Sequence, residues 1–286
     1  MKQINFAMIL LLALAAACSA AGQAVVAPPV VSTRNPQTAG QLVREMVANE
    51  LAQHDASAWN YRMERLEKGI TKTYTVVDST GGPMSLPICQ GGSPVSQEAR
   101  SADLSRLRRL IASQDEMAKK AAQSKEDDKK VEVVLRNLPD GLLFEYDGGD
   151  EQEIRLKFEP NPNFKPPSLE TRVFKALAGT LVINRAEKRM VRLEGHLMHD
   201  VSFGWGVLGN LRQGGTFKVA QTELASGYWA LTSLDVEMDG KVLLFHNLDV
   251  KERLRLLNFH ALDKPPSPAD ALALLEAQPR ACSSTL

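Results

Sequence analysis

The chain has few of the residues that metal centres and nucleic-acid interfaces need. Of its 286 residues only three are cysteine and five are histidine, and 34 Lys and Arg balance 34 Asp and Glu. A formal net charge of +0 argues against a nucleic-acid-binding protein, because such proteins carry a basic surface. The sequence contains no GxSxG or HExxH motif, so the signatures of serine hydrolases and zinc proteases are missing. We therefore expect no enzyme activity, no bound metal and no cofactor.

Long apolar runs are missing too, except near the start of the chain. Lys2 precedes an apolar run over 6–17, and small residues follow up to Ala24. This run is shorter than the roughly 20 residues that a membrane-spanning helix needs, and its order is typical of a secretion signal. We expect a signal peptide over 1–24, a periplasmic or cell-envelope protein and no transmembrane segment after cleavage. In the alternative, a lipoprotein signal, Cys18 is lipidated. Residues 25–37 form a flexible spacer in either case.

The other two cysteines, Cys89 and Cys282, are the only pair left in the folded part of the chain. Disulfides persist in exported proteins, so these residues are a possible disulfide. Such a bond closes a loop of nearly the whole domain, which stabilises the fold by about 5 kcal/mol on the chain-entropy estimate. The alternative is two separate thiols.

The first half of the chain predicts helices and a few strands. With 44% hydrophobic residues, a chain of this length forms one large domain, which we place over 38–262. Apolar residues at helical spacing predict an amphipathic helix over 38–54. Alternation around Tyr61 and around Tyr74 predicts two strands. After a Gly- and Pro-rich loop, the polar segment 97–137 predicts a long charged helix, broken once.

The second half reads as strands and turns. Alternating segments predict a hairpin around Gly148 and Gly149 and another around 186–188. Further strands run to Leu262, with a hairpin turn expected at Asp239 and Gly240. The tail 263–286 is Pro-rich and ends in a short helix. The predicted fold class is α+β: a large curved antiparallel sheet, a half-open barrel of about nine or ten strands, with the N-terminal helix and the charged helix packed on or beside it.

Histidines cluster in the strand predicted over 190–203. Because side chains alternate between the two faces of a sheet, His196 and His199 point to opposite faces and cannot share a metal within this strand. The odd positions of this strand are mostly apolar, so we expect His199 on the apolar face as a hydrogen-bonded core residue.

Residues 204–209 read GWGVLG, a literal match to the dinucleotide fingerprint. That fingerprint requires a strand that leads into a helix, and here another strand is predicted to begin at Phe217. The glycines are better explained as a wide turn.

Two stretches carry a resemblance to known proteins. They are FEPNPNFKPPSLETRVFKALAGTLVI (Phe158–Ile183) and LEGHLMHDVSFGWGVLGNLRQGGTF (Leu193–Phe217), and they resemble an uncharacterised family of exported bacterial proteins. The order of elements over 38–262 is similar to that of the lipoprotein-carrier (LolA-like) superfamily, whose half-open barrel cups an apolar cavity beneath helices. The resemblance implies that fold for the domain, but no binding residue of the carriers can be matched to a position here.

A concave apolar sheet face is suited to a hydrophobic ligand, such as a lipid, an acyl chain or an acylated protein. The candidate lining residues are the large apolar or aromatic residues of the predicted strands: Trp59, Tyr61, Phe144, Tyr146, Phe158, Leu197, His199, Val201 and Phe203. The alternative is an envelope interaction or sensor module whose sheet is filled by its own helices and whose proline loop at 160–167 and turn around Trp205 dock another envelope protein. An open cavity favours the first function and a filled sheet the second.

Overall fold

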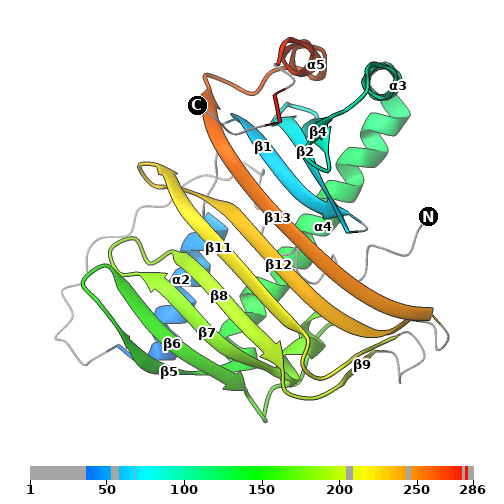
Figure 1. Ribbon diagram of the computed structural model, residues 1–286. Coiled ribbons are helices and arrows are strands. Elements are labelled where there is room, and N and C mark those ends of the chain that lie inside the picture. The colour runs from blue at the N-terminus through cyan, green and yellow to red at the C-terminus, as the bar shows by residue number, and fades with distance from the viewer. Residues whose placement is uncertain are drawn as a thin grey trace.

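The protein is an open antiparallel sheet with helices packed against it (Figure 1). The computed structural model describes residues 37–52, 58–67, 69–203, 209–242, 246–278 and 281–282. The helices are α2 (Ala39–Ala52), α3 (Gln97–Ala112), α4 (Gln114–Gly141), α5 (Pro268–Ala277) and the 3-10 helix η1 (Glu170–Lys175). The strands are β1 (Ala58–Glu67), β2 (Ile70–Val77), β3 (Met84–Gln90), β4 (Ser93–Pro94), β5 (Leu142–Gly149), β6 (Glu153–Pro160), β7 (Leu177–Asn184), β8 (Met190–Leu197), β9 (Val201–Phe203), β10 (Gly209–Leu211), β11 (Thr216–Ala225), β12 (Tyr228–Val242) and β13 (His246–Leu262).

The strands form one 13-stranded sheet in the order β4-β3-β2-β1-β13-β12-β11-β8-β7-β6-β5, with β10 paired to β12 and to β9. The two ends of this order do not pair, so the sheet is not closed. The predicted α+β class is confirmed, and the sheet has more strands than the nine or ten expected. Segment 84–90, which was expected to be a loop, is strand β3.

The first helix begins and ends close to its predicted limits. Thr38 and Gln41 form a capping box: the Gln41 N–H donates to Thr38 Oγ1 at 3.2 Å, and the Thr38 N–H donates to Gln41 Oε1 at 3.0 Å. Such reciprocal bonds satisfy donors that a helix start leaves open. Leu42 and Met46, one turn apart, are fully buried, so one face of α2 packs on the sheet as its apolar spacing predicts.

The long charged helix is broken at Ser113, which ends α3 and caps α4. The Ser113 hydroxyl accepts the Glu116 N–H at 3.3 Å, and this confirms the single break. The middle of α4 is polar and mostly exposed, with Lys130 paired to Glu126 one turn away. Only its last third, from Val131 to Leu138, carries a buried apolar stripe.

Two apolar cores lie along the sheet. We call the face on which α2 and the end of α4 pack the inner face, and the opposite one the outer face; in Figure 1 both helices lie behind the sheet. The main core joins these helices to the inner faces of β5–β8 and β10–β13. The second core lies at the other end of the sheet, where α3 and α5 pack on β2 and β3.

The sequence pair Asp239 and Gly240 is not a turn. β12 continues through both residues to Val242, with Gly240 paired to Leu248. A Cβ on Gly240 would lie 2.1 Å from the carbonyl oxygen of Asn210 in β10. This glycine is therefore needed for the close approach of β10. β12 and β13 do form a hairpin, but the expectation that Asp239 and Gly240 are its turn is wrong.

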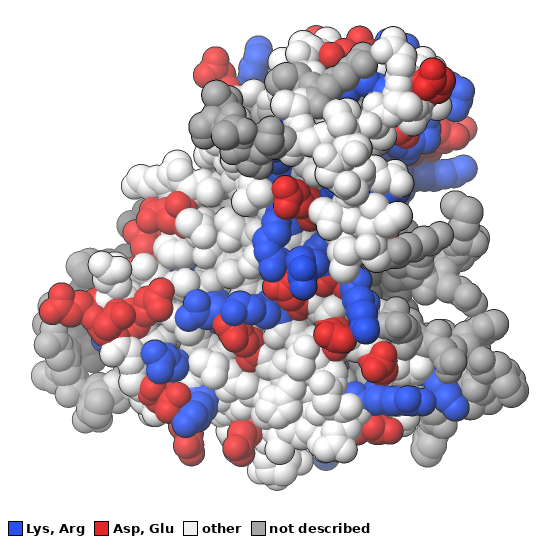
Figure 2. Space-filling model, in the orientation of Figure 1, with Lys and Arg blue, Asp and Glu red and all other residues white. Residues whose placement is uncertain are grey.

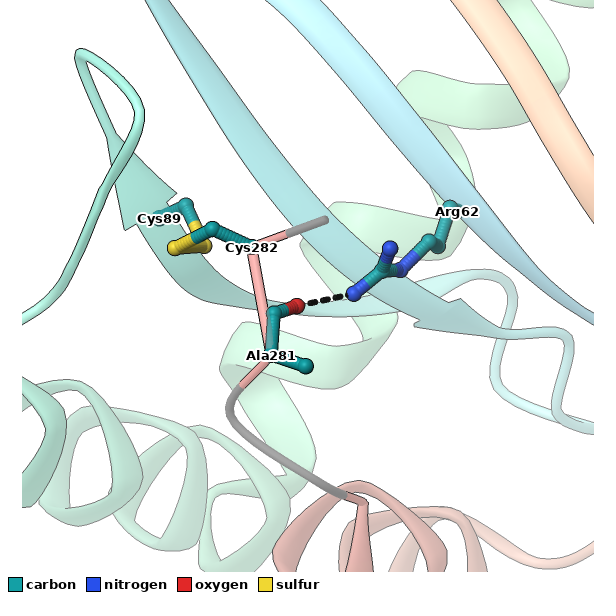
Figure 3. The surroundings of a disulfide bond; sticks show 4 residues. All are labelled: Arg62, Cys89, Ala281 and Cys282. Carbon is teal, nitrogen blue, oxygen red and sulfur yellow. Dashed lines mark hydrogen bonds between the residues drawn. A yellow bond between two sulfur atoms is a disulfide. The ribbon is translucent and has the colours of Figure 1, made fainter. Parts of the chain in front are cut away.

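A disulfide fastens the C-terminal tail to the sheet (Figure 3). Cys89 in β3 and Cys282 are joined with an S–S distance of 2.00 Å, as the sequence suggested. The Arg62 guanidinium donates to the carbonyl oxygen of Ala281 beside this bond. The buried Arg100 of α3 donates to the carbonyl oxygens of Leu275 and Glu276 at the end of α5, each at 3.2 Å. The described part of the tail is thus packed on the domain.

Candidate functional site

The nine residues predicted to line a ligand site are distributed over three environments. Four are buried core residues: Trp59, Phe158, Leu197 and Val201. Tyr61 and Phe144 are half-buried, and Tyr146 and His199 are exposed. The backbone of Phe203 lies in β9, whereas its side chain lies outside the described part of the structure. The predicted set therefore does not line one common surface.

His199 does not lie on the apolar face, and the expectation that it does is wrong. β8 ends at Leu197, where the Leu197 N–H donates to Gly215 O and the Met198 N–H donates to Ala176 O, so the strand does not continue. The imidazole of His199 is exposed, with Nε2 3.0 Å from the carbonyl oxygen of Lys175. Among the described residues no group of three or more His, Cys, Asp or Glu is placed to hold a metal ion.

Tyr146 lies on the edge strand β5 and is 52% exposed. Its hydroxyl donates to the carbonyl oxygen of Gln37 at 2.9 Å, which ties the start of the described chain to β5. Its contact is therefore structural. The cysteine considered for lipidation, Cys18, the signal segment 1–24 and residues 25–36 of the spacer lie outside the described residues, as do residues 204–208 of the glycine-rich segment.

A strip of half-buried apolar side chains lies on the inner face of β1 and β13, beside the main core. We call it the β1–β13 strip, and its members are Tyr61, Met63, Leu256 and Phe259. Met63 and Leu256 are directly paired across the two strands and pack against the main core. The rings of Tyr61 and Phe259 stack with centroids 5.1 Å apart. Unlike the inner faces of β6–β8, this part of the sheet keeps large apolar side chains partly open to solvent.

A β-bulge shapes one end of the strip. The pairing of β1 with β13 shifts between Asn60 and Arg62, and Asn258 adopts a positive φ of 53°. The extra residue in β13 brings Phe259 against Tyr61, because a bulge moves later side chains to the other face. Behind them, Trp59 stacks on Tyr228 at 4.9 Å. The Trp59 indole nitrogen is buried with no hydrogen-bond partner among the described residues, so this end of the strip is closely packed.

The other end of the strip is polar. Arg65 follows Met63 on the same face of β1 by strand alternation, and its guanidinium pairs with Glu252 of β13 at 3.0 Å. Glu67, next on that face, accepts the Tyr74 hydroxyl at 2.8 Å and pairs with Lys72 at 3.0 Å.

The titration of this end follows from its contacts. Burial alone would raise the pKa of Glu67, but the hydrogen bonds from Tyr74 and Lys72 lower it below its ordinary value. Burial and the neighbouring Glu67 carboxylate raise the pKa of Tyr74. At neutral pH Glu67 is therefore negatively charged and Tyr74 is neutral. The apolar strip thus ends at a group of paired charges formed by Arg65, Glu67 and Lys72.

The outer face holds a shallow hollow of about 720 Å³ that is lined by β6, β7, β8 and β11–β13. Its charged side chains alternate in sign from strand to strand, and Figure 2 shows acidic and basic atoms interspersed over this face. Four of them form one cross-strand row, which we call the charged ladder: Glu194 (β8), Lys218 (β11), Asp235 (β12) and Arg253 (β13). Lys218 pairs with Glu194 at 3.0 Å, and Arg253 pairs with Asp235 at 3.3 Å.

No family model, curated protein or solved structure matches this chain in comparisons with known proteins. Within the described ranges no helix has the length and apolar character needed to cross a membrane. The site must therefore be interpreted from its own geometry.

Sequence reasoning found one side of the β1–β13 strip and missed the other. Tyr61 was identified as a candidate, but Leu256 and Phe259 were not, although a strand was expected there. The bulge at Asn258 places Phe259, and a residue with positive φ in mid-strand leaves no pattern in the sequence. The pairing of β1 with β13 joins distant segments, which short-range alternation cannot reveal.

Proposed function

We propose that the protein is an exported, non-enzymatic binding protein of the cell envelope that holds a hydrophobic ligand on the β1–β13 strip. The ligand class is a lipid, an acyl chain or an acylated protein. The observation that supports this proposal is the strip itself, in which Tyr61, Met63, Leu256 and Phe259 stay half-buried beside a closed core. Export rests on the signal-like segment 1–24.

The strip has the chemistry that a chain-like ligand requires. Each methylene group moved from water onto an apolar surface contributes about 0.8 kcal/mol, and two rows of side chains offer a path along the strands. Arg65 lies at the end of this path, where its guanidinium can hydrogen-bond an acidic head group as well as Glu252. A single-chain amphiphile with a carboxylate or phosphate head fits this order of apolar and charged groups.

The resemblance to the lipoprotein-carrier superfamily supports the same ligand class. In that architecture a curved sheet offers its apolar side to lipid beneath helices. In the present protein α2 and the end of α4 cover much of the inner face, so the proposed site is the part of the inner face on β1 and β13, beside the main core.

Fluorescent fatty-acid binding, together with mass spectrometry of lipids that co-purify with the protein, tests the proposal. Met63→Gln places an amide in the strip, and we expect it to weaken binding of the probe at least tenfold, which corresponds to about 1.4 kcal/mol. Met198→Gln is the matched control, because Met198 is 43% exposed and lies outside the strip. Melting curves of both variants establish that the fold is kept. Absence of co-purified lipid and of probe binding, or equal binding by both variants, would reject the proposal.

A second candidate function is an envelope interaction module. It is favoured by the filling of the inner face, since Leu42, Met46 and Leu138 of the two helices are buried against the sheet. In that case lipid binding is absent and chemical cross-linking in the native envelope recovers a protein partner.

A further inference from the structure

The described part of the tail that follows β13, residues 263–278 and 281–282, packs on a small core of its own. α5 contributes three buried side chains to this second core: Ala271, Leu272 and Leu275. No described residue of the tail belongs to the main core. Figure 1 shows α5 beside α3 at one end of the sheet, away from α2. The tail can therefore leave its place while the main core stays closed.

α5 lies in a groove between α3 and the sheet. We call it the α5 groove, and its apolar members are Val77, Met84, Leu86 and Leu107. At one end of the groove Arg100, which is 5% exposed, donates to the carbonyl oxygens of Leu275 and Glu276. The last carbonyls of a helix have no partner within that helix, so Arg100 satisfies the end of α5. The groove thus holds both the apolar side and the end of one short helix.

α5 depends on attachments at both of its ends. It has 10 residues, and a free helix of that length is marginal in water. Before the helix, the Thr80 N–H donates to the carbonyl oxygen of Pro266 at 2.9 Å. After the helix, Cys282 is bonded to Cys89 of β3. Opening this bond removes the covalent attachment and leaves α5 held by its non-covalent contacts with the groove.

The two cysteines of the bond differ in exposure. Cys89 is 2% exposed, whereas Cys282 is half-buried. A thiolate attacks the sulfur that it can reach, so a dithiol reductant should attack Sγ of Cys282. This step forms a mixed disulfide on Cys282 and releases Cys89 as a thiolate, which takes up a proton. The second thiol of the reductant then displaces Cys282, so the products are two cysteine thiols and one oxidised dithiol.

We propose that α5 is a redox-controlled latch on the outer face: when a dithiol reductant opens the bond between Cys89 and Cys282, α5 leaves its groove and unfolds. The occupant of the α5 groove in the oxidised protein is α5 of the same chain. Release uncovers the apolar groove while α2 and the main core remain in place. The latch is separate from the proposed ligand site. Tyr61 of the strip pairs with Val76, so Val77 of the groove, the next residue, points to the opposite face.

Amide hydrogen exchange of the full chain, followed by mass spectrometry, tests the proposal with dithiothreitol as the dithiol. In the reduced protein we expect the amides of α5 to exchange at least about tenfold faster than in the oxidised protein, because local opening sets their rate. The amides of α2 and β7 should remain protected on the same time scale. Cys282→Ser should behave like the reduced protein, and dithiothreitol should not change it further.

Two substitutions within α5 separate release from the groove from a general loosening of the domain. Leu275 is fully buried in the groove, whereas its neighbour Leu274 is 37% exposed. Leu275→Gln should speed the exchange of α5 further in the reduced protein, and Leu274→Gln should not. Three results would overturn the proposal: α5 amides that stay equally protected after reduction, protection lost in α2 and β7 together with α5, and equal effects of the two glutamine variants. Fatty-acid binding is not measured in these experiments, so a failure of the latch is distinct from a failure of the proposed ligand site.

Discussion

The ring of Phe217 in β11 covers Gly195, its direct partner in β8. A Cβ on Gly195 would lie 2.6 Å from Cε1 of Phe217 and 2.9 Å from the carbonyl oxygen of Ala178. Gly195 is in turn paired with Gly179, and Gly179 is paired with Phe158. Two buried rings therefore close over two glycines in one cross-strand row on the core side of the sheet.

Gly195→Ala should destabilise the protein by about 1–3 kcal/mol, the usual effect of an added methyl group in a packed core. The free energy of unfolding in urea measures this change. Gly40→Ala is the control, because a Cβ there meets nothing closer than 3.6 Å and Gly40 lies inside α2. Alanine at that helical position should leave stability unchanged or raise it by up to about 1 kcal/mol. Equal effects of the two substitutions would contradict the close packing of Phe217.

Opening the disulfide between Cys89 and Cys282 should lower the free energy of unfolding by up to about 5 kcal/mol, since the bond closes a loop with a sequence separation of 193. Cys282→Ser is the better variant because Cys89 is buried. Denaturation with and without a thiol reductant measures the loss. The reductant should not affect Cys282→Ser further, and an unchanged midpoint for the reduced unmodified protein would refute a stabilising bond.

Asp78 should make stability depend on pH. Burial raises the pKa of this carboxyl to about 6, although the carboxyl accepts a hydrogen bond from the backbone N–H of Trp59 at 3.2 Å. The folded state thus binds a proton more tightly than the unfolded chain, where the pKa is 3.8. The resulting stabilisation is complete below the unfolded pKa and is lost as pH rises through about 6, by about 3 kcal/mol at 1.4 kcal/mol per unit.

Asp78→Asn isolates this contribution, because an amide oxygen can still accept the Trp59 N–H. Relative to this variant, the unmodified protein should lose stability between pH 4 and pH 7, as measured by urea denaturation at each pH. A constant difference between the two proteins would show that Asp78 does not titrate in this range.

The buried pair of Glu50 and Arg189 should be costly to break. Glu50 is 7% exposed, pairs with Arg189 at 3.0 Å and accepts the Met190 N–H at 2.8 Å. Burial raises the pKa of Glu50, and Arg189 opposes that shift. Glu50→Ala leaves a buried guanidinium without its acid, so we expect a loss of about 3–5 kcal/mol in thermal or urea unfolding.

Replacing both residues, Glu50→Met with Arg189→Met, should recover most of that loss, because apolar pairs often substitute for buried ions. The exposed pair of Glu132 and Arg136 is the comparison. Glu132→Ala should cost less than about 1 kcal/mol. If Glu50→Ala cost no more than Glu132→Ala, the buried pair would not hold α2 to β8.

Local patterns predicted the elements whose causes are local. The apolar spacing of Leu42 and Met46 predicted α2, and the caps at Thr38 and Ser113 explain where α2 begins and where the charged helix breaks. Where a distant segment decides the conformation, the sequence misled. Gly240 looks like a turn residue, but it is a glycine because Asn210 passes close to it, and that approach depends on tertiary structure.

The candidate site was harder to predict than the fold for the same reason. Alternation placed Tyr61 correctly on one face of its strand, but the other side of the strip depends on the bulge at Asn258. Alternation placed His199 on the apolar face, but the strand ends at Leu197, two residues earlier, so the alternation does not extend to His199. Periodicity assigns faces only while a strand is uninterrupted, and both errors occur where pairing changes.

The pairing of β1 with β13 joins the first and the last of the described strands in chain order. The contact order of this fold is therefore high. Because the chain is synthesised in the N-to-C direction, β1 emerges with one edge unpaired and keeps it until Leu262 has followed. Open strand edges are sites of aggregation, and long-range pairing is slow. The completion of the sheet, and then of the disulfide at Cys282, must therefore wait for the end of synthesis, and a chaperone that shields strand edges would act during that interval.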